Sequence, residues 1–478
     1  MRHFADVNAV FTESFGGASG LHPPARATVQ VRLGGARLML DAVALVGGAA
    51  AAAAGRFEVR TSLNVGSRSL WAPQCIGPYC QANVLRRQVG ESRGALNAVD
   101  ALEMRWPRMT KQSLRSGACL NDHYHQELRQ GVRRCHCNGA WSRAFSPAAP
   151  CFPLHSVLCS GQIGLEPATM QLVRGGPRAQ LRKSLRSTAR VLAACGSALP
   201  LCFSVVLYVA EAALRTPGGD LAGLAELAAV WSSGRQLGGA PARAKARRRA
   251  AASTASSNEG GSDSDGDERA LGGAVDNANE AEEDSELEAE RMVPLGSAAY
   301  PAPRLGGAAA GPPVLLLVVP ALPRGALVEV EVMAASSTAA AEGGGLRTIC
   351  SAGGDELLST RAASTSVAGS AWSCTAVAWI REDLGEAKLD ELVGALTAQV
   401  ERCASAAASA GSASGQLRVR AFVTHDLWPY AAVIRRRLAA ALSTATAGDA
   451  VSVVPITQLT YGQCTTDVRG MALIVSLY

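Results

Sequence analysis

The residues with the clearest potential for chemistry are histidines and cysteines gathered in the segment 86–155, which is also rich in Arg and Trp. They are His123, His125, Cys135, His136 and Cys137. Imidazole nitrogens and thiolates are ligands that Zn²⁺ prefers, but zinc sites usually space each ligand pair by about two to four residues around a turn. The H-x-H and C-H-C spacings fit that rule only in part. A zinc site, an inserted loop and an error in the gene model all remain open.

A second pair with acid–base potential is His425-Asp426, which follows a predicted strand at Leu417–Val423. Acid–base catalysis needs a reacting group within hydrogen-bond reach of the acid or base. No nucleophilic residue lies at a spacing from this pair that would indicate a catalytic site. An aspartate that caps a turn at the end of a strand is the interpretation we favour.

The net charge of +6 comes from arginines scattered along the chain rather than from one basic stripe. Proteins that bind nucleic acid usually concentrate their basic residues on one face. The densest cluster here, Arg243–Arg249, is followed at once by acidic sequence that would neutralise it. We therefore expect no nucleic-acid partner.

No targeting or membrane signal stands out in the sequence. The opening MRHFADVNAVF has neither an apolar core nor a cleavage signature. The longest apolar stretch, Leu201–Leu214, is interrupted by Ser204 and Glu211 and is too short to span a bilayer. The 13 cysteines are odd in number and form no C-x-x-C pair, which is typical of reduced thiols. We expect a cytoplasmic protein with no membrane partner.

The elements that must position any site follow from hydrophobic periodicity. Helical stripes mark residues 4–15, 177–196, 389–400 and 434–442, and strand patterns mark 28–33, 37–44, 314–319, 327–333, 417–423, 451–454 and 471–477. The first two strands are expected to pair across the turn Gly34-Gly35. Alternation of this kind favours an α+β fold, in which helices pack on one face of a mixed sheet. Residues 234–294 are too polar to offset the entropy of ordering and predict a disordered insert.

Several ordered segments resemble the RidA (YjgF) family, whose members are also described as endoribonuclease L-PSP-like. WAPQCIGPYCQAN (Trp71–Asn83) is similar to the family's opening strand motif, which typically reads IGPYSQA. SGQIGLEPATMQLVRGG and AQLRKSLRSTARVLAACG resemble its next strand and first helix. FADVNAVFTESF (Phe4–Phe15) and PPARATVQVRL (Pro23–Leu33) resemble its second helix and arginine-bearing strand.

The order of these matches implies tandem RidA-like modules with a chorismate-mutase-like fold. Residues 1–50 resemble the closing half of a first module, and residues 57–335 a second module interrupted by the inserts 86–155 and 234–294. Residues 365–478 form a third α+β module that is similar only in element order. RidA proteins are trimers with sites between subunits, so a trimeric or pseudo-trimeric assembly is expected.

The resemblance also implies a reaction. RidA proteins hydrolyse enamine and imine acids to ammonia and a keto acid. Arg26, in PPARATV, stands at the family's arginine position, where a guanidinium would clamp the substrate carboxylate in a bidentate way. Glu331 matches the glutamate that handles water, as general base or as orienting group. Asn8, Tyr79, Ser160 and Gly161 match substrate-binding positions.

No single module carries the full set. Val314 stands where the second module should have its arginine, and the first module has Asp41 in place of a glutamate. Cys80 replaces the small polar residue that usually follows the tyrosine. Because these losses are complementary, we hypothesise that Arg26 of one module faces Tyr79 or Ser160 of another. The alternative is a degenerate scaffold in which Arg26 pairs with a surface carboxylate.

The tandem order and the wording WAP-x-CIGPY and SGQIGLEPATM resemble the carboxy-terminal region of diphthine–ammonia ligases. There an amino-terminal ATP-pyrophosphatase domain, with a loop that reads roughly S-G-G-x-D-S, activates diphthine on elongation factor two for amidation by ammonia. SAGGDELLS (Ser351–Ser359) lacks the final Asp-Ser. We therefore expect no cofactor in this chain, ATP only in the full-length ligase, and elongation factor two as partner. A stand-alone imine deaminase and a non-catalytic scaffold are the alternatives.

Overall fold

The computed structural model describes most of the segments in which periodicity predicts elements. The described residues are 3–15, 23–34, 36, 38–42, 56–89, 154–232, 314–336, 346–354, 358–367, 372–380, 386–408, 417–442, 451–461, 464–465 and 469–477. The chain divides into two compact units, and the elements below belong to the unit of Met1–Gln88, Pro153–Asp276 and Pro303–Tyr478, except for the last residue of β2. The cluster His123, His125, Cys135, His136, Cys137 and the acidic insert lie outside the described residues.

The first sheet is mixed. Its strands are β1 (Arg56–Leu63), β2 (Ala82–Val89), β3 (Leu154–Cys159), β4 (Gln162–Ile163), β5 (Cys202–Ala210), β6 (Val314–Val319), β7 (Val328–Ala335), β13 (Gln458–Tyr461) and β14 (Cys464–Thr465). They run in the order β1-β2-β3-β7-β5-β6-β13-β14, and β4 also pairs with β7. β5 lies parallel to β6 but antiparallel to β7. Strand β5 therefore separates β6 from β7, which correspond to the predicted strands 314–319 and 327–333.

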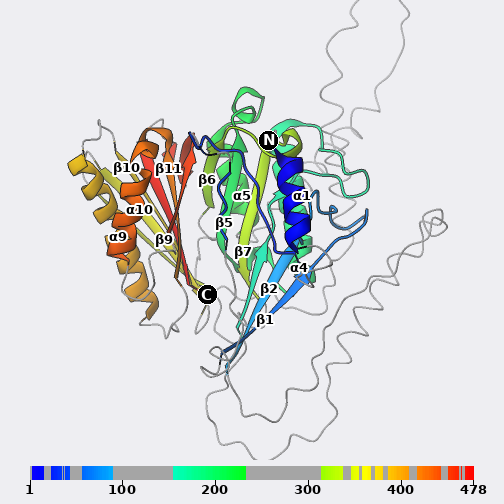
Figure 1. The fold of residues 1–478 in the computed structure, drawn as a ribbon, viewed down its shortest axis with the longest axis horizontal. Coiled ribbons are helices and arrows are strands. Elements are labelled where there is room, and N and C mark those ends of the chain that lie inside the picture. The colour runs from blue at the N-terminus through cyan, green and yellow to red at the C-terminus, as the bar shows by residue number, and fades with distance from the viewer. Residues whose placement is uncertain are drawn as a thin grey trace, which may run out of the picture. The chain divides into compact units, whose positions relative to one another are not determined.

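Helices α4 (Gly176–Ala194) and α5 (Leu221–Ser232) cover one face of this sheet (Figure 1). The stripe of Leu181, Leu185 and Leu192 is fully buried against it, as spacings of four and seven residues on one helical face require. The facing strand residues include Val328, Val330 and Val332 of β7. Glu329 and Glu331, which alternate with these valines, must point to the opposite face of the sheet.

The second sheet has the same two-layer arrangement. Its strands are β8 (Leu346–Gly354), β9 (Leu358–Val367), β10 (Trp372–Ile380), β11 (Leu417–Thr424), β12 (Val451–Ile456) and β15 (Arg469–Leu477). They run in the order β12-β11-β15-β10-β9-β8. Helices α9 (Glu386–Ala408) and α10 (Ala431–Ala441) pack on one face through Leu389, Leu392, Leu396, Ile434 and Leu438. The α+β class with helices on one face of mixed sheets is thus confirmed for both sheets.

A third apolar cluster joins the helix-free faces of the two sheets. This inter-sheet core contains Val206, Tyr208, Leu315 and Leu317 of the first sheet and Val377, Trp379, Phe422 and Ile474 of the second. Strand β13, from the carboxy-terminal third of the sequence, pairs antiparallel with β6 of the first sheet. The first sheet therefore includes a strand from the carboxy-terminal third, and side-chain packing joins it to the second sheet.

The amino-terminal part has one helix and an extended segment. Helix α1 (Phe4–Phe15) forms as its stripe predicts, although none of its residues is buried. The predicted hairpin of 28–33 with 37–44 is wrong within the described residues. Its backbone groups have other partners: the Gln30 N–H donates to the Ala321 carbonyl at 3.0 Å, and the Thr28 N–H donates to the Glu329 carboxylate. The segment consequently lies along the first sheet with isolated bridges at Ala25–Cys80 and Gln30–Ala321.

The second sheet begins at Leu346, before residue 365 at which the third module was expected to start. His425-Asp426 begins the short 3-10 helix η5 (His425–Tyr430), directly after β11. Among the described helices, none is both long and apolar enough to cross a membrane.

Candidate functional site

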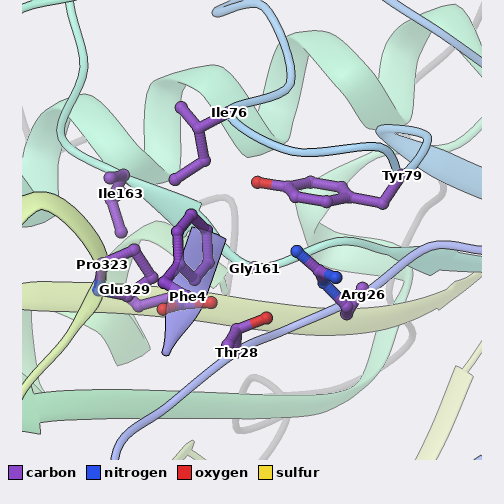
Figure 2. A pocket seen from close by; sticks show the side chains of 9 residues that line it. All are labelled: Phe4, Arg26, Thr28, Ile76, Tyr79, Gly161, Ile163, Pro323 and Glu329. Atoms are coloured by element: carbon purple, nitrogen blue, oxygen red, sulfur yellow. The ribbon is translucent and has the colours of Figure 1, made fainter. Parts of the chain in front are cut away.

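A small pocket lies where the extended amino-terminal segment crosses the first sheet. It is lined by Phe4, Arg26, Thr28, Ile76, Tyr79, Gly161, Ile163, Pro323 and Glu329. Figure 2 shows Arg26, Tyr79 and Glu329 around it, together with Phe4 from α1. The cavity volume of about 10 Å³ accommodates roughly one water molecule. A larger ligand would require α1, the least buried wall, to move.

The backbone of Arg26 is fixed by two hydrogen bonds of its own and by one at Pro24, two residues earlier. The Cys80 N–H donates to the Pro24 carbonyl and the Gly161 N–H to the Arg26 carbonyl, both at 3.3 Å. The Arg26 N–H donates to Ser160 Oγ at 3.0 Å, and that hydroxyl donates to the Cys80 carbonyl. Ser160 is fully buried, so it positions Arg26 rather than facing the pocket.

The guanidinium of Arg26 lies among three aromatic rings. Its central carbon is 5.8 Å from the ring centroid of Phe4, 4.7 Å from Phe11 and 4.9 Å from Tyr79. Nη2 donates to Asn8 Oδ1 at 2.5 Å. Such ring contacts stabilise a cation without using its N–H groups. The stack therefore holds the guanidinium while leaving donors available.

Two of these donors are unused. Nε and Nη1 of Arg26 are buried and have no hydrogen-bond partner among the described residues. An unpaired buried N–H of a cation costs a substantial part of its hydration free energy. Burial accordingly lowers the pKa of Arg26, against the opposing influence of Tyr79 and Glu329. An anion that accepted both N–H bonds would remove this cost, so the arrangement suits a small carboxylate.

Glu329 brings an acid–base group to the same pocket. Glu329 is 2% exposed, and its Oε2 has no hydrogen-bond partner within the described structure. Burial raises its pKa from 4.5 to about 8, and repulsion from Glu331 adds to the rise. The Thr28 N–H and Arg26 oppose it. A carboxyl with this pKa can both donate and accept a proton near neutral pH.

Two glycines allow these side chains to approach. A Cβ atom on Gly161 would lie 1.7 Å from Glu329 Oε1. On Gly77 it would lie 2.9 Å from Arg26 Nη2 and 3.0 Å from Asn8 Oδ1. A side chain at either position would push the carboxyl or the guanidinium out of place.

The structure brings together most of the residues that the sequence singled out. Asn8, Tyr79 and Gly161 contact or line the space around Arg26, and Ser160 holds its backbone. Tyr79 is largely buried, which raises the pKa of its phenol, so it faces the guanidinium as a neutral ring. Arg26 thus lies against Tyr79 and Ser160.

Glu331 is the exception, because it does not line this pocket. It accepts hydrogen bonds from Arg420 Nη1 at 2.9 and 3.0 Å and from the Tyr208 hydroxyl at 2.8 Å. The carboxyl beside Arg26 belongs to Glu329, two residues earlier on the same face of β7. Strand alternation places both glutamates on the same face of β7, so the sequence pattern could not decide which of them lines the pocket.

Neither a metal site nor an ATP loop is found in the described part of the chain. No group of three or more potential metal ligands occurs among the described residues. In SAGGDELLS, Gly353 and Gly354 end β8 and pair with Thr360 and Ser359 of β9. An antiparallel pair of strands is not the strand–loop–helix unit that cradles phosphates, so these residues do not fit ATP.

Comparisons with known proteins give matches only among solved structures. No family model and no curated protein matches the chain. The Rid-family protein YyfA from Yersinia pestis is 14% identical, with 58% of this chain and 98% of that chain covered and a TM-score of 0.20. A candidate endoribonuclease from Thermotoga maritima MSB8 is 13% identical, with coverages of 41% and 88% and a TM-score of 0.20. RidA from Psychrobacter sp. PAMC 21119 is 17% identical, with coverages of 41% and 91% and a TM-score of 0.19.

Proposed function

We propose that this chain is the RidA-like region of a diphthine–ammonia ligase and that its Arg26 site hydrolyses a small imino or enamino acid, releasing ammonia. One observation carries the catalytic part. A guanidinium with two buried, unused nitrogen donors lies in one pocket with a buried carboxyl that can exchange a proton near neutral pH. Those are a clamp for a carboxylate and a group that can handle water.

The reaction needs few parts. Arg26 Nε and Nη1 would bind the substrate carboxylate, and Phe4, Ile76 and Ile163 would exclude bulk water. Glu329 would protonate the imine nitrogen and then accept a proton from the attacking water. In the resulting aminoalcohol, Glu329 would return its proton to the nitrogen, the C–N bond would break, and the hydroxyl proton would pass to Glu329. One water is consumed, and ammonia and a keto acid leave. No step requires a metal or a redox change.

The test uses imino acids generated in the assay by an amino-acid oxidase, with the keto acid and ammonia measured after addition of the chain. Arg26→Ala should lower kcat/KM by at least about 100-fold, because the clamp is lost. Arg26→Lys should recover little, since a point charge cannot make the paired contacts. Arg32→Ala, on the same segment but paired with Glu211 at the surface, serves as control and should keep full activity. Unchanged hydrolysis in Arg26→Ala would refute the catalytic proposal.

The ligase assignment has its own test. It is supported by the motifs WAPQCIGPY and SGQIGLEPATM. The chain, combined with an ATP-pyrophosphatase domain of a diphthine–ammonia ligase, should bind diphthine-bearing elongation factor two and raise the yield of diphthamide with ATP and an imino acid as nitrogen source. Mass spectrometry of the factor gives the yield. Hydrolysis of the imino acid without any effect on diphthine amidation would indicate a stand-alone deaminase. Binding of elongation factor two without hydrolysis would indicate a scaffold.

A further inference from the structure

The ion pair of Arg420 and Glu331 joins the two sheets, and Glu331 lies two residues from the pocket residue Glu329 on β7. Arg420, on β11 of the second sheet, has a side chain only 8% exposed, and Glu331, on β7 of the first sheet, is 15% exposed. Arg420 Nη1 lies 2.9 and 3.0 Å from the two carboxylate oxygens. Arg420 also lies over the ring of Phe422, at 5.6 Å from its centroid.

These contacts keep Glu331 ionised. Burial alone would raise its pKa, but Arg420, the Tyr208 hydroxyl and Arg418 outweigh it, and the pKa is held below its ordinary value. In return, Glu331 raises the pKa of Arg420 in spite of burial. A fixed negative charge is therefore present at position 331 near neutral pH.

Glu331 and Glu329 share a face of the same strand, two residues apart, where side chains are near neighbours. The groups that face Glu329 are Arg26 and the Thr28 N–H on the extended segment and Glu331 on β7. Tyr79 and Tyr208 also interact with it electrostatically from the adjoining loop and from β5. Of these, only Glu331 carries a negative charge near neutral pH.

We propose that the ion pair between Arg420 of the second sheet and Glu331 of the first acts together with burial to keep Glu329 protonated in its pocket. Arg420 is a positioning residue: it holds a charge on Glu331, and that charge adds to the effect of burial in keeping the proton on Glu329. The catalytic meaning of this coupling rests on the proposed imine hydrolysis, but the coupling itself does not. The two carboxyls titrate as a linked pair, and Arg420 decides which of them is neutral.

The test is an infrared titration of the full chain. The band of the protonated Glu329 carboxyl is assigned by its loss in Glu329→Gln. In the double variant Glu331→Gln, Arg420→Met, the midpoint of this band should fall by about one pH unit or more, because a like charge nearby is removed. Neutral replacement of both partners of a buried pair is usually tolerated. The single variant Glu331→Gln should move the midpoint in the same direction.

Two control variants test the interpretation. Glu331→Asp retains the charge and should keep the midpoint near the original one. The double variant Lys183→Met, Glu166→Gln removes a different ion pair, between α4 and the loop after β4, and should not shift the midpoint. An unchanged midpoint in the Glu331→Gln variants would overturn the inference even if hydrolysis is observed. A shifted midpoint in a chain without hydrolysis would uphold the coupling and refute the proposed function instead.

Discussion

At the scale of single residues, the missing side chain of Gly161 is what admits Glu329 to the pocket. The distance of 1.7 Å from a Cβ atom at this position to Glu329 Oε1 is far inside van der Waals contact. Because Glu329 is 2% exposed, its carboxyl has little free space into which it could move. The site therefore depends on glycine at position 161 as much as on its charged residues.

Gly161→Ala should destabilise the protein by about 1–3 kcal/mol, since the added carbon overpacks a buried position. It should also abolish imine hydrolysis by displacing Glu329. Urea denaturation and the keto-acid assay measure the two effects. Gly66→Ala is the matched control, because a Cβ atom there meets nothing within 4 Å. Equal stability of the two variants would contradict the close approach at Gly161.

Glu329 should also make stability depend on pH. Its pKa is about 8 in the folded chain and 4.5 as the ordinary value, so the folded state holds more protons in that window. The free energy of unfolding should fall as pH rises through the window, by at most about 1.4 kcal/mol per pH unit. Glu329→Gln should remove this slope, measured by urea denaturation between pH 5 and about 8. The exposed Glu226→Gln on α5 should retain it.

At the scale of elements, helices α4 and α1 are held by different forces. α4 buries a continuous stripe against the first sheet, whereas α1 buries none of its residues. α1 is instead held through Phe4, Asn8 and Phe11, which contact the Arg26 guanidinium. α4 therefore belongs to the stable scaffold, and α1 is the wall of the pocket that opens most readily.

This difference predicts hydrogen exchange. The amides of α1 should exchange at least about 100-fold faster than those of α4, because fewer packed contacts must break to open the helix. Leu185→Ala in α4 should cost about 2–5 kcal/mol, while Leu70→Ala, at a residue 64% exposed, should change stability by less than about 0.5 kcal/mol. Mass spectrometry of exchanged peptides and urea denaturation give these values. Equal protection of α1 and α4 would show that α1 is packed more firmly than its exposure indicates.

At the scale of the whole unit, the two sheets depend on one another. They share the inter-sheet core and the Arg420–Glu331 pair. Phe422, 2% exposed on β11, is among the largest fully buried side chains and lies in that shared core. Neither sheet would keep its helix-free face out of water if the other unfolded.

One cooperative unfolding transition should therefore be seen. Phe422→Ala should lower its stability by about 3–5 kcal/mol and shift the curves from circular dichroism and tryptophan fluorescence together. Trp231 packs against the first sheet and Trp379 lies in the second, so tryptophan fluorescence reports on both sheets. Two separate transitions, with only one affected by Phe422→Ala, would contradict the shared core.

The sequence by itself determined the strongly periodic elements and much of the site. The stripes at helical spacing in α1, α4, α9 and α10 and the apolar runs in β6, β7 and β11 appear where predicted, because periodicity is a local property. Arg26, Asn8, Tyr79 and Gly161 could be singled out from motifs. β8, β9 and β10 were not marked, since strands rich in Ala, Ser and Thr give a weak hydrophobic signal.

Only the tertiary structure decided which elements are neighbours. It placed β5 between β6 and β7, and it left the segment 28–33 without a hairpin partner because Ala321 and Glu329 take its N–H groups. It also chose between two glutamates on one face of β7: Glu329 meets the pocket of Arg26, and Glu331 meets Arg420. Strand period fixes the face on which a side chain lies, whereas its partner comes from a segment distant in sequence.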